Sequence, residues 1–131
     1  MNKVAIITGA GQGIGLAIAR KLVENGTQVL LNDREKGLTQ EAVASLSRLK
    51  KGSVIGCSGD AADPEVIAEL VSLALQNFGH IDQLVCNAGI TLFGNFLDYS
   101  RADFMEVTRV NQAGTFFLSQ AVAQVCAIKL K

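Results

Sequence analysis

The sequence has no excess of charge of either sign. Its 131 residues contain 12 Lys and Arg against 12 Asp and Glu, so the formal net charge at neutral pH is zero. A protein without a basic surplus has no long-range field that attracts nucleic acid or an anionic membrane surface. We therefore expect neither nucleic acid nor a membrane among its partners.

Long apolar runs and paired cysteines are lacking as well. No run approaches the roughly 20 apolar residues of a membrane span, and the N-terminus enters a strand pattern without the charged-then-apolar order of a secretion signal. Cys57, Cys86 and Cys126 lie far apart without CxxC spacing. This is typical of reduced, buried thiols in an intracellular protein. We expect a cytoplasmic protein without a metal site.

Histidine and proline each occur once. His80 falls in a predicted turn, where we interpret it as a solvated loop residue rather than a general base. Pro64 follows Asp63, and this order suits the start of a helix, with Asp63 as the capping residue and Pro64 in the first position.

Four short runs rich in Val, Ile and Leu recur along the chain without alternating with polar residues, which predicts strands buried on both faces. The segments between them have helical spacing of apolar residues. Strand, helix, strand, helix is the order of a parallel sheet covered on both sides, an α/β fold in one domain over residues 1–131. The predicted strands are Val4 to Ile7, Val29 to Leu31, Val54 to Cys57, and Leu84 to Cys86.

The last predicted helix is longer than the others. Ser100, with Asp103 three residues later, is a candidate N-cap, and the helical pattern continues to about Ile128. Asn111 interrupts its apolar stripe. Because a buried amide must find hydrogen-bond partners, Asn111 belongs either to a structural contact or to a site, and both interpretations stay open. The stripe comprises Phe104, Val107, Asn111, Gly114, Leu118, Ala121 and Val125.

A glycine-rich stretch, Thr8-Gly9-Ala10-Gly11-Gln12-Gly13-Ile14-Gly15, joins the first strand to the first helix. Four glycines this close together favour a turn in which the backbone approaches another group. A strand entering such a turn and a helix leaving it present free N–H groups and the positive end of a helix dipole, which together suit a phosphate. The alternative is a tight turn without a ligand.

Polar and small residues follow each of the next three strands. Asp33 ends the second strand, and a carboxylate there can accept both ribose hydroxyls of an adenosine and repel a 2′-phosphate, although the neighbouring Arg34 could instead hold that phosphate. Gly59-Asp60-Ala61-Ala62-Asp63 follows the third strand and Asn87-Ala88-Gly89 the fourth. Ligands bind at this edge of an open parallel sheet. The alternatives are a solvated strand end at Asp33 and simple caps or turns at the other two segments.

Taken together, these features resemble the short-chain dehydrogenase/reductase family over nearly the whole chain, to about Ala123. The resemblance rests on the Thr-Gly-xxx-Gly-x-Gly turn, Asp33, Asp60, the Asn-Ala-Gly segment, and Val110-Asn111 in the long helix. It implies a doubly wound, Rossmann-like parallel sheet and a nicotinamide dinucleotide cofactor, with NAD favoured and NADP left open. The implied substrate is an alcohol or carbonyl compound.

The resemblance also assigns roles to individual residues. Asn111 corresponds to the family's catalytic asparagine, where the helix backbone helps to hold a water of the proton relay. Thr8 and Asn87 would bond across the glycine turn and the fourth strand. The residues implied in cofactor binding are Thr8, Gly9, Gln12, Gly13, Ile14, Gly15, Asp33, Arg34, Asp60, Ala61, Asn87, Ala88, Gly89 and Val110.

The family's catalytic serine and its Tyr-x-x-x-Lys pair have no counterpart in the sequence. The only tyrosine is Tyr99, and the residue four positions later is Asp103. We therefore expect the cofactor-binding half of an oxidoreductase, truncated after the fourth strand and a long helix, as a short gene product or a fragment. The tail from Val125 to Lys131 also lacks the glycine-rich turn that usually leads to a fifth strand.

Such a chain would leave the fourth strand as a sheet edge and Phe116 and Phe117 exposed, which predicts a homo-oligomer or marginal stability. The chain alone is predicted to be inactive. Besides the dehydrogenase/reductase, two further hypotheses stay open, a non-catalytic dinucleotide-binding module or partner subunit, and a scaffold without a ligand.

Overall fold

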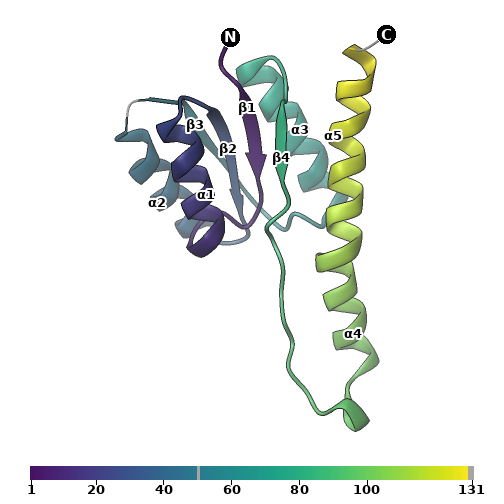
Figure 1. Cartoon of the computed structure of the whole chain (residues 1–131). Coiled ribbons are helices and arrows are strands. Elements are labelled where there is room, and N and C mark those ends of the chain that lie inside the picture. Colours follow the sequence, from purple (N-terminus) through teal and green to yellow (C-terminus); the bar gives the residue numbers. More distant parts are fainter. Residues whose placement is uncertain (50, 130–131) are drawn as a thin grey trace.

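A computed structural model describes residues 1–49 and 51–129. Its centre is a parallel sheet of β1 (Val4–Ile7), β2 (Gln28–Asp33), β3 (Val54–Ser58) and β4 (Gln83–Val85), in the order β3-β2-β1-β4 (Figure 1). Ile6 pairs with Leu30 on one side and with Leu84 on the other. The chain order reverses between β1 and β4, which makes their carboxyl ends the place where a doubly wound sheet binds ligands.

Helices cover both faces of the sheet (Figure 1). α1 (Gly13–Glu24) and α2 (Lys36–Ser47) pack on the face that presents Ala5, Ile7 and Leu31. α3 (Pro64–Phe78) and α5 (Thr115–Lys129) pack on the face that presents Ile6 and Leu30. Successive strand residues point to opposite faces, so the uninterrupted apolar runs supply both cores. The predicted two-sided, Rossmann-like parallel sheet is confirmed.

The central and edge strands differ in burial. β1 and β2 are buried almost throughout, as the apolar runs predict, whereas β3 and β4 are only partly buried. The prediction of burial on both faces therefore fails for these two strands, which lie at the two edges of the sheet that the described residues form. Among the strands of the described chain, β4 lies at an edge of the sheet, as expected.

Two details of the helices differ from the prediction. The apolar spacing of this segment predicts a buried face of Ile14, Ala17, Ile18 and Leu22. In the structure the buried residues of α1 are Gly15, Ala19 and Val23. Ile18 and Leu22 pack partly buried against the same core, but Ile14 is 75% exposed and Ala17 is also exposed, so half of the predicted face is wrong. Pro64 is the first residue of α3, as predicted, but within the described chain the side chain of Asp63 accepts no capping hydrogen bond.

The long helix is built from three segments, α4 (Arg101–Thr108), a π-helical turn η2 (Arg109–Gly114), and α5. Ser100 caps it, because its Oγ accepts a 2.9 Å hydrogen bond from the Asp103 backbone N–H. The helix extends beyond the sheet together with the preceding extended segment and the short 3₁₀ turn η1 (Phe96–Asp98) (Figure 1). Its outer half consequently lacks a covering layer.

The expected apolar stripe of this helix is only partly buried. Leu118 and Gly114 are buried, but Phe104 is 60% exposed and Asn111 is also exposed. The expectation of a buried Asn111 amide is therefore wrong, because Asn111 lies where the helix has passed the edge of the sheet. Phe116 and Phe117 are exposed, as predicted.

The cysteines and His80 also depart in part from expectation. Cys57 is buried, and burial together with the nearby Glu69 carboxylate raises the pKa of its thiol to about 11. Cys86 and Cys126 are only partly buried. His80 is partly buried instead of freely solvated, and its ring nitrogen Nε2 lies 3.0 Å from the Asp82 carboxylate.

Two further observations concern the helices and the tail. Of the helices that the structure describes, none combines the length and apolar character that crossing a membrane requires. The predicted tail from Val125 to Lys131 is helical as far as residue 129, and its last two residues lie outside the described part of the chain.

Candidate functional site

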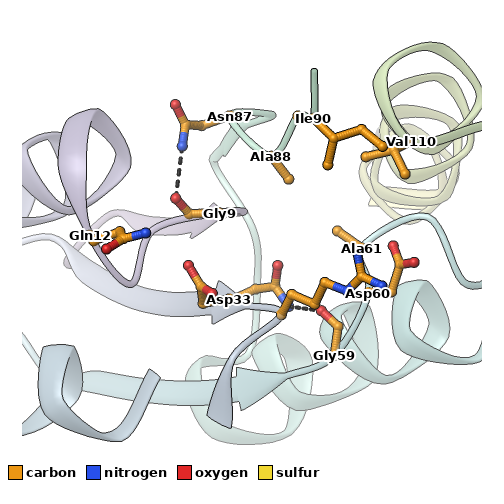
Figure 2. A pocket seen from close by; sticks show the side chains of 13 residues that line it. Gly9, Gln12, Asp33, Gly59, Asp60, Ala61, Asn87, Ala88, Ile90 and Val110 are labelled. Carbon is orange, nitrogen blue, oxygen red and sulfur yellow. Dashed lines mark hydrogen bonds between the residues drawn. The ribbon is translucent and has the colours of Figure 1, made fainter. Parts of the chain in front are cut away.

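A cavity of about 280 Å³ opens where the carboxyl ends of the four strands meet (Figure 2). Its walls come from the glycine turn after β1, the ends of β2 and β3, the segment after β4, and η2. Thirteen residues line it, Gly9, Gln12, Asn32, Asp33, Arg34, Gly59, Asp60, Ala61, Asn87, Ala88, Gly89, Ile90 and Val110.

The glycine turn brings the backbone close to its neighbours at two points. Gly9 has φ +61°, and a Cβ on it would lie 2.8 Å from the Cα of Ala88. A Cβ on Gly11 would lie 2.7 Å from Oδ2 of Asp33. Any larger residue would collide at both positions. The turn therefore needs glycine in order to fit between the ends of β2 and β4.

Thr8 and Asn87 fasten this turn to the segment after β4. The Thr8 hydroxyl oxygen accepts hydrogen bonds from the backbone N–H groups of Asn87 and Ala88, each at 3.1 Å. The Asn87 side-chain Nδ2 donates to the Gly9 carbonyl at 2.9 Å (Figure 2). The predicted bonding of Thr8 and Asn87 across the glycine turn and the fourth strand is thus present.

The start of α1 lies beside the cavity but does not line it. Thr8, Gly13, Ile14 and Gly15 are missing from the lining residues of the described chain. Gly13 has φ +61°, which favours glycine at the first position of the helix. The first N–H groups of an α-helix have no partner within the helix, and the first turn of α1 is uncharged in sequence, so this end can attract an anion.

Asp33 occupies the wall at the end of β2. Its Oδ2 accepts a 2.9 Å hydrogen bond from the Gly11 N–H, and its Oδ1 accepts one of 3.0 Å from Glu35 N–H. The residue is 8% exposed, and it lines the cavity beside Arg34. These bonds hold the carboxylate in one orientation at the rim of the glycine turn.

Sequence reasoning missed Asn32 and Ile90, whereas Gly59 belongs to the segment after the third strand that was expected at this edge. Asn32 is buried, and its Nδ2 donates to the carbonyls of Cys57 and Gly59, both at 3.0 Å, which ties the end of β2 to the end of β3. The available signal was an amide directly after a buried apolar strand. No comparable signal marks Ile90, because its place in the wall follows from the path of the loop after β4.

Asp60, Ala61 and Val110 form the opposite wall (Figure 2). Asp60 Oδ1 accepts a 2.9 Å hydrogen bond from Ala62 N–H, and Asp60 Oδ2 lies 2.6 Å from Nη2 of Arg109. Burial alone would raise the pKa of the Asp60 carboxyl, but the hydrogen bonds from Arg109 and Ala62 outweigh it and lower that pKa. Asp60 is therefore a carboxylate at neutral pH.

Asn111 stands outside the cavity wall. Its Oδ1 accepts a hydrogen bond from the Ile90 N–H and its Nδ2 donates to the Ile90 carbonyl, both at 2.8 Å. The side chain thus fixes the segment after β4 to η2. Of the predicted site residues, ten lie together in the wall, while Asn111 and the four at the start of α1 and the end of β1 lie next to it.

The chemical character of the site is that of a binding cleft. Its wall offers two carboxylates, the guanidinium of Arg34 and small side chains, and the N-terminus of α1 lies beside it. Among the described residues, no group of three or more His, Cys, Asp and Glu side chains is placed to hold a metal ion.

Comparison with known proteins finds dehydrogenases and reductases that are similar in sequence to most of this chain. The short chain dehydrogenase family model matches residues 3–128. Versicolorin reductase 1 of Aspergillus parasiticus is 38% identical over 119 residues, which are 91% of this chain and 45% of that protein. L-rhamnose 1-dehydrogenase (NAD(P)(+)) of a Sphingomonas species is 39% identical over 125 residues, which are 94% of this chain and 48% of that protein. The chain spans about half the length of these curated relatives.

Solved structures show the same relationship in three dimensions. NAD⁺-bound xylitol dehydrogenase superposes with a TM-score of 0.91 at 33% identity, over 97% of this chain and 49% of that one. An alcohol dehydrogenase from Thermococcus sibiricus, complexed with 5-hydroxy-NADP, superposes with a TM-score of 0.88 at 31% identity, over 95% and 53%. With a family match over residues 3–128 and this geometry, the chain belongs to the short-chain dehydrogenase/reductase family.

Proposed function

We propose that the cavity binds a nicotinamide dinucleotide, with the pyrophosphate at the glycine turn and the start of α1. The observation that carries the proposal is the fit of the turn. A Cβ at Gly9 would collide with the backbone of Ala88, so the turn lies close to the segment after β4. The Asn87 side-chain amide fixes the turn in this position by its hydrogen bond to the Gly9 carbonyl. The first N–H groups of α1 supply donors for the phosphates without a competing carboxylate in that turn.

The adenosine would lie between Asp33 on one side and Asp60, Ala61 and Val110 on the other. The Gly11 N–H holds the Asp33 carboxylate in one orientation. The carboxylate oxygens can then accept hydrogen bonds from the ribose hydroxyls, while their negative charge repels a 2′-phosphate. This supports NAD as the preferred cofactor. Arg34 lines the same end of the cavity, and a guanidinium there is the feature that would allow NADP.

The reaction proposed for the whole protein is hydride transfer between this cofactor and an alcohol or carbonyl substrate. The cofactor supplies the hydride chemistry when bound. The residues of this chain bind and orient it, and Asn111 fixes the Ile90 segment at the nicotinamide side of the cleft. The sequence contains no Tyr-x-x-x-Lys pair for proton exchange with the substrate oxygen. A homo-oligomer and a cytoplasmic location stay predictions.

Calorimetric titration of the purified chain with NAD⁺ and with NADP⁺ tests the proposal. We expect saturable binding of NAD⁺, and weaker binding of NADP⁺. Asp33→Asn should weaken NAD⁺ binding by about tenfold, as expected for loss of a hydrogen bond to a charged group. Asp98→Asn, an exposed carboxylate in η1, is the matched control and should leave the affinity unchanged. Absence of heat with either dinucleotide would refute the proposal.

A further inference from the structure

The guanidinium of Arg109 joins the long helix to the wall of the cavity. Its Nη2 lies 2.6 Å from Asp60 Oδ2 and 2.9 Å from Glu106 Oε1, and its Nε donates to Glu106 Oε2 at 3.0 Å. Arg109 and Asp60 are 49 positions apart in sequence, whereas Glu106 is three residues away on the same helix. Glu106 therefore holds the guanidinium from its own helix, and the Nη2 that the guanidinium shares with Glu106 also reaches Asp60.

This ion pair joins η2 to the loop after β3, and a close approach of backbone and side chain joins them at another point. That point is Gly114, where a Cβ would lie 3.0 Å from the Cβ of Ala62. Hydrogen bonds in a π-helix run from residue i to residue i+5, so Arg109 and Gly114 follow one another on one face of η2. The π-helical turn thereby directs both contacts at the segment from Asp60 to Ala62.

The docking fixes one dimension of the cavity. Val110, the residue after Arg109, lines the wall next to Ala61 and Asp60, so the position of η2 sets the space between these side chains (Figure 2). Asp60 is held from both sides, with Oδ1 on the Ala62 N–H and Oδ2 on Arg109. The side chain of Asp60 is 19% exposed, which leaves its pair with Arg109 only partly screened by water.

We propose that Arg109 is a positioning residue for the base-binding end of the cavity, which holds Asp60 and Val110 at the spacing that an adenine ring requires. The inference rests on the proposed dinucleotide function. Arg109 acts through Asp60 and η2 and does not itself line the cavity. Its effect should therefore fall on the adenosine half of a dinucleotide and spare the nicotinamide half.

Binding of NAD⁺, AMP and nicotinamide mononucleotide to Arg109→Met tests this, with AMP and the mononucleotide titrated by NMR chemical shifts. We expect NAD⁺ and AMP to bind about tenfold more weakly, the size of a partly exposed charge-assisted hydrogen bond. The mononucleotide should change less than twofold. Arg109→Lys keeps the positive charge but cannot bond both carboxylate oxygens of Glu106 at once. It should therefore recover part of the affinity for NAD⁺ and AMP that Arg109→Met loses. Arg101→Met, an exposed arginine at the start of α4, is the control.

A double-mutant cycle separates positioning from general damage to the fold. In an Asp60→Asn background, Arg109→Met should cause no further loss of AMP affinity, because the two residues act through one contact. Unchanged AMP binding in Arg109→Met, equal weakening of both half-molecules, or a full additional loss in the Asp60→Asn background would overturn the inference. If Arg109→Met does not fold, Arg109→Lys is measured in its place and in the same cycle. Failure of the wild-type chain to bind NAD⁺ would instead refute the proposed function.

Discussion

The side-chain amide of Asn87 lies against the first turn of α1 as well as the glycine turn. Its Nδ2 donates a 2.9 Å hydrogen bond to the Gly9 carbonyl, and a Cβ on Gly15 would lie 2.5 Å from that nitrogen and 2.6 Å from the Gly9 oxygen. One hydrogen bond and one missing methyl group therefore determine how closely α1 approaches β4.

Gly15→Ala should destabilise the chain and weaken NAD⁺ binding together. The new methyl group must displace either the Asn87 amide or the Gly9 carbonyl, and such overpacking costs about 1–3 kcal/mol. Urea unfolding gives the stability change, and calorimetry gives the affinity. The control is Gly37→Ala in the first turn of α2, where a Cβ meets no atom of the described chain within 4 Å.

Gly37→Ala should stabilise the chain by about 0.5–1 kcal/mol, because alanine restricts the unfolded chain and favours the helix. The two substitutions thus have opposite expected signs for the same chemical change. A Gly15→Ala protein as stable as the wild type, with undiminished affinity for NAD⁺, would show that the close approach in the structure is not needed.

The ion pair between Asp60 and Arg109 should make stability depend on pH in the acid range. Hydrogen bonds from Arg109 and Ala62 lower the pKa of Asp60 in the folded chain below the unfolded value of about 3.9. A lowered folded pKa contributes stability that is present above the unfolded pKa and is lost as the pH falls through the folded one. Glu106 acts in the same direction, since its hydrogen bond with Arg109 lowers its pKa.

Urea midpoints measured from pH 7 to pH 3 test this for wild type and Asp60→Asn. The wild type should be the more stable protein at pH 7, and its advantage should shrink as the pH falls below about 4. Asp103→Asn, at the capped start of α4, serves as a carboxylate control. A constant difference between wild type and Asp60→Asn across this range would contradict the role given to the pair.

Most of the fold was predictable from the sequence because its signals are local. The apolar runs specify β1 to β4, and Ser100 with Asp103 marks the start of the long helix. The order of strands follows from the alternation of strands and helices together with the family's pattern. Burial of particular side chains was harder to predict, since Asn111 has a regular place in an apolar stripe yet lies beyond the sheet.

The site was predictable where it depends on glycine and missed where it depends on distant pairs. Gly9 and Asp33 stand in recognisable local patterns at strand ends. The pairing of Arg109 with Asp60 has no local signal, because the two residues meet only after α3 and the long helix have packed on the same face of the sheet. From the sequence alone, an arginine on a helix is equally well explained as a solvated side chain, because most arginines are exposed.

Phe116 and Phe117 should promote self-association. Their rings pack edge to face, 5.2 Å between centroids, and the side chains are 60% and 53% exposed. Adjacent exposed aromatic rings favour contact with another apolar surface. Light scattering at rising concentration should show oligomers for wild type and a shift toward monomer for the Phe116→Ser, Phe117→Ser double variant.

Ile128→Ser is the control for this double variant, because Ile128 is 75% exposed near the end of the same helix and stands outside the Phe pair. It should leave the association unchanged. A wild-type chain that remains monomeric at all concentrations and unfolds at high temperature would count against the prediction.

The 131-residue chain should bind its cofactor without turning over a carbonyl substrate. Its only tyrosine, Tyr99, donates its hydroxyl to the Leu92 carbonyl at 2.6 Å, and the position four residues later holds Asp103 in place of a lysine. Tyr99 is therefore a loop contact and not the acid of the reaction.

Incubation of the purified chain with NADH and a panel of ketones and aldehydes tests this, with absorbance at the reduced-nicotinamide band as the readout. We expect the rate of the protein-free mixture. Asn111→Ala and Tyr99→Phe are assayed in parallel because they distinguish enzymatic turnover from a contaminant. Reduction that Asn111→Ala or Tyr99→Phe abolishes would place a proton donor within this chain, and the assignment of Tyr99 to the loop alone would then be wrong.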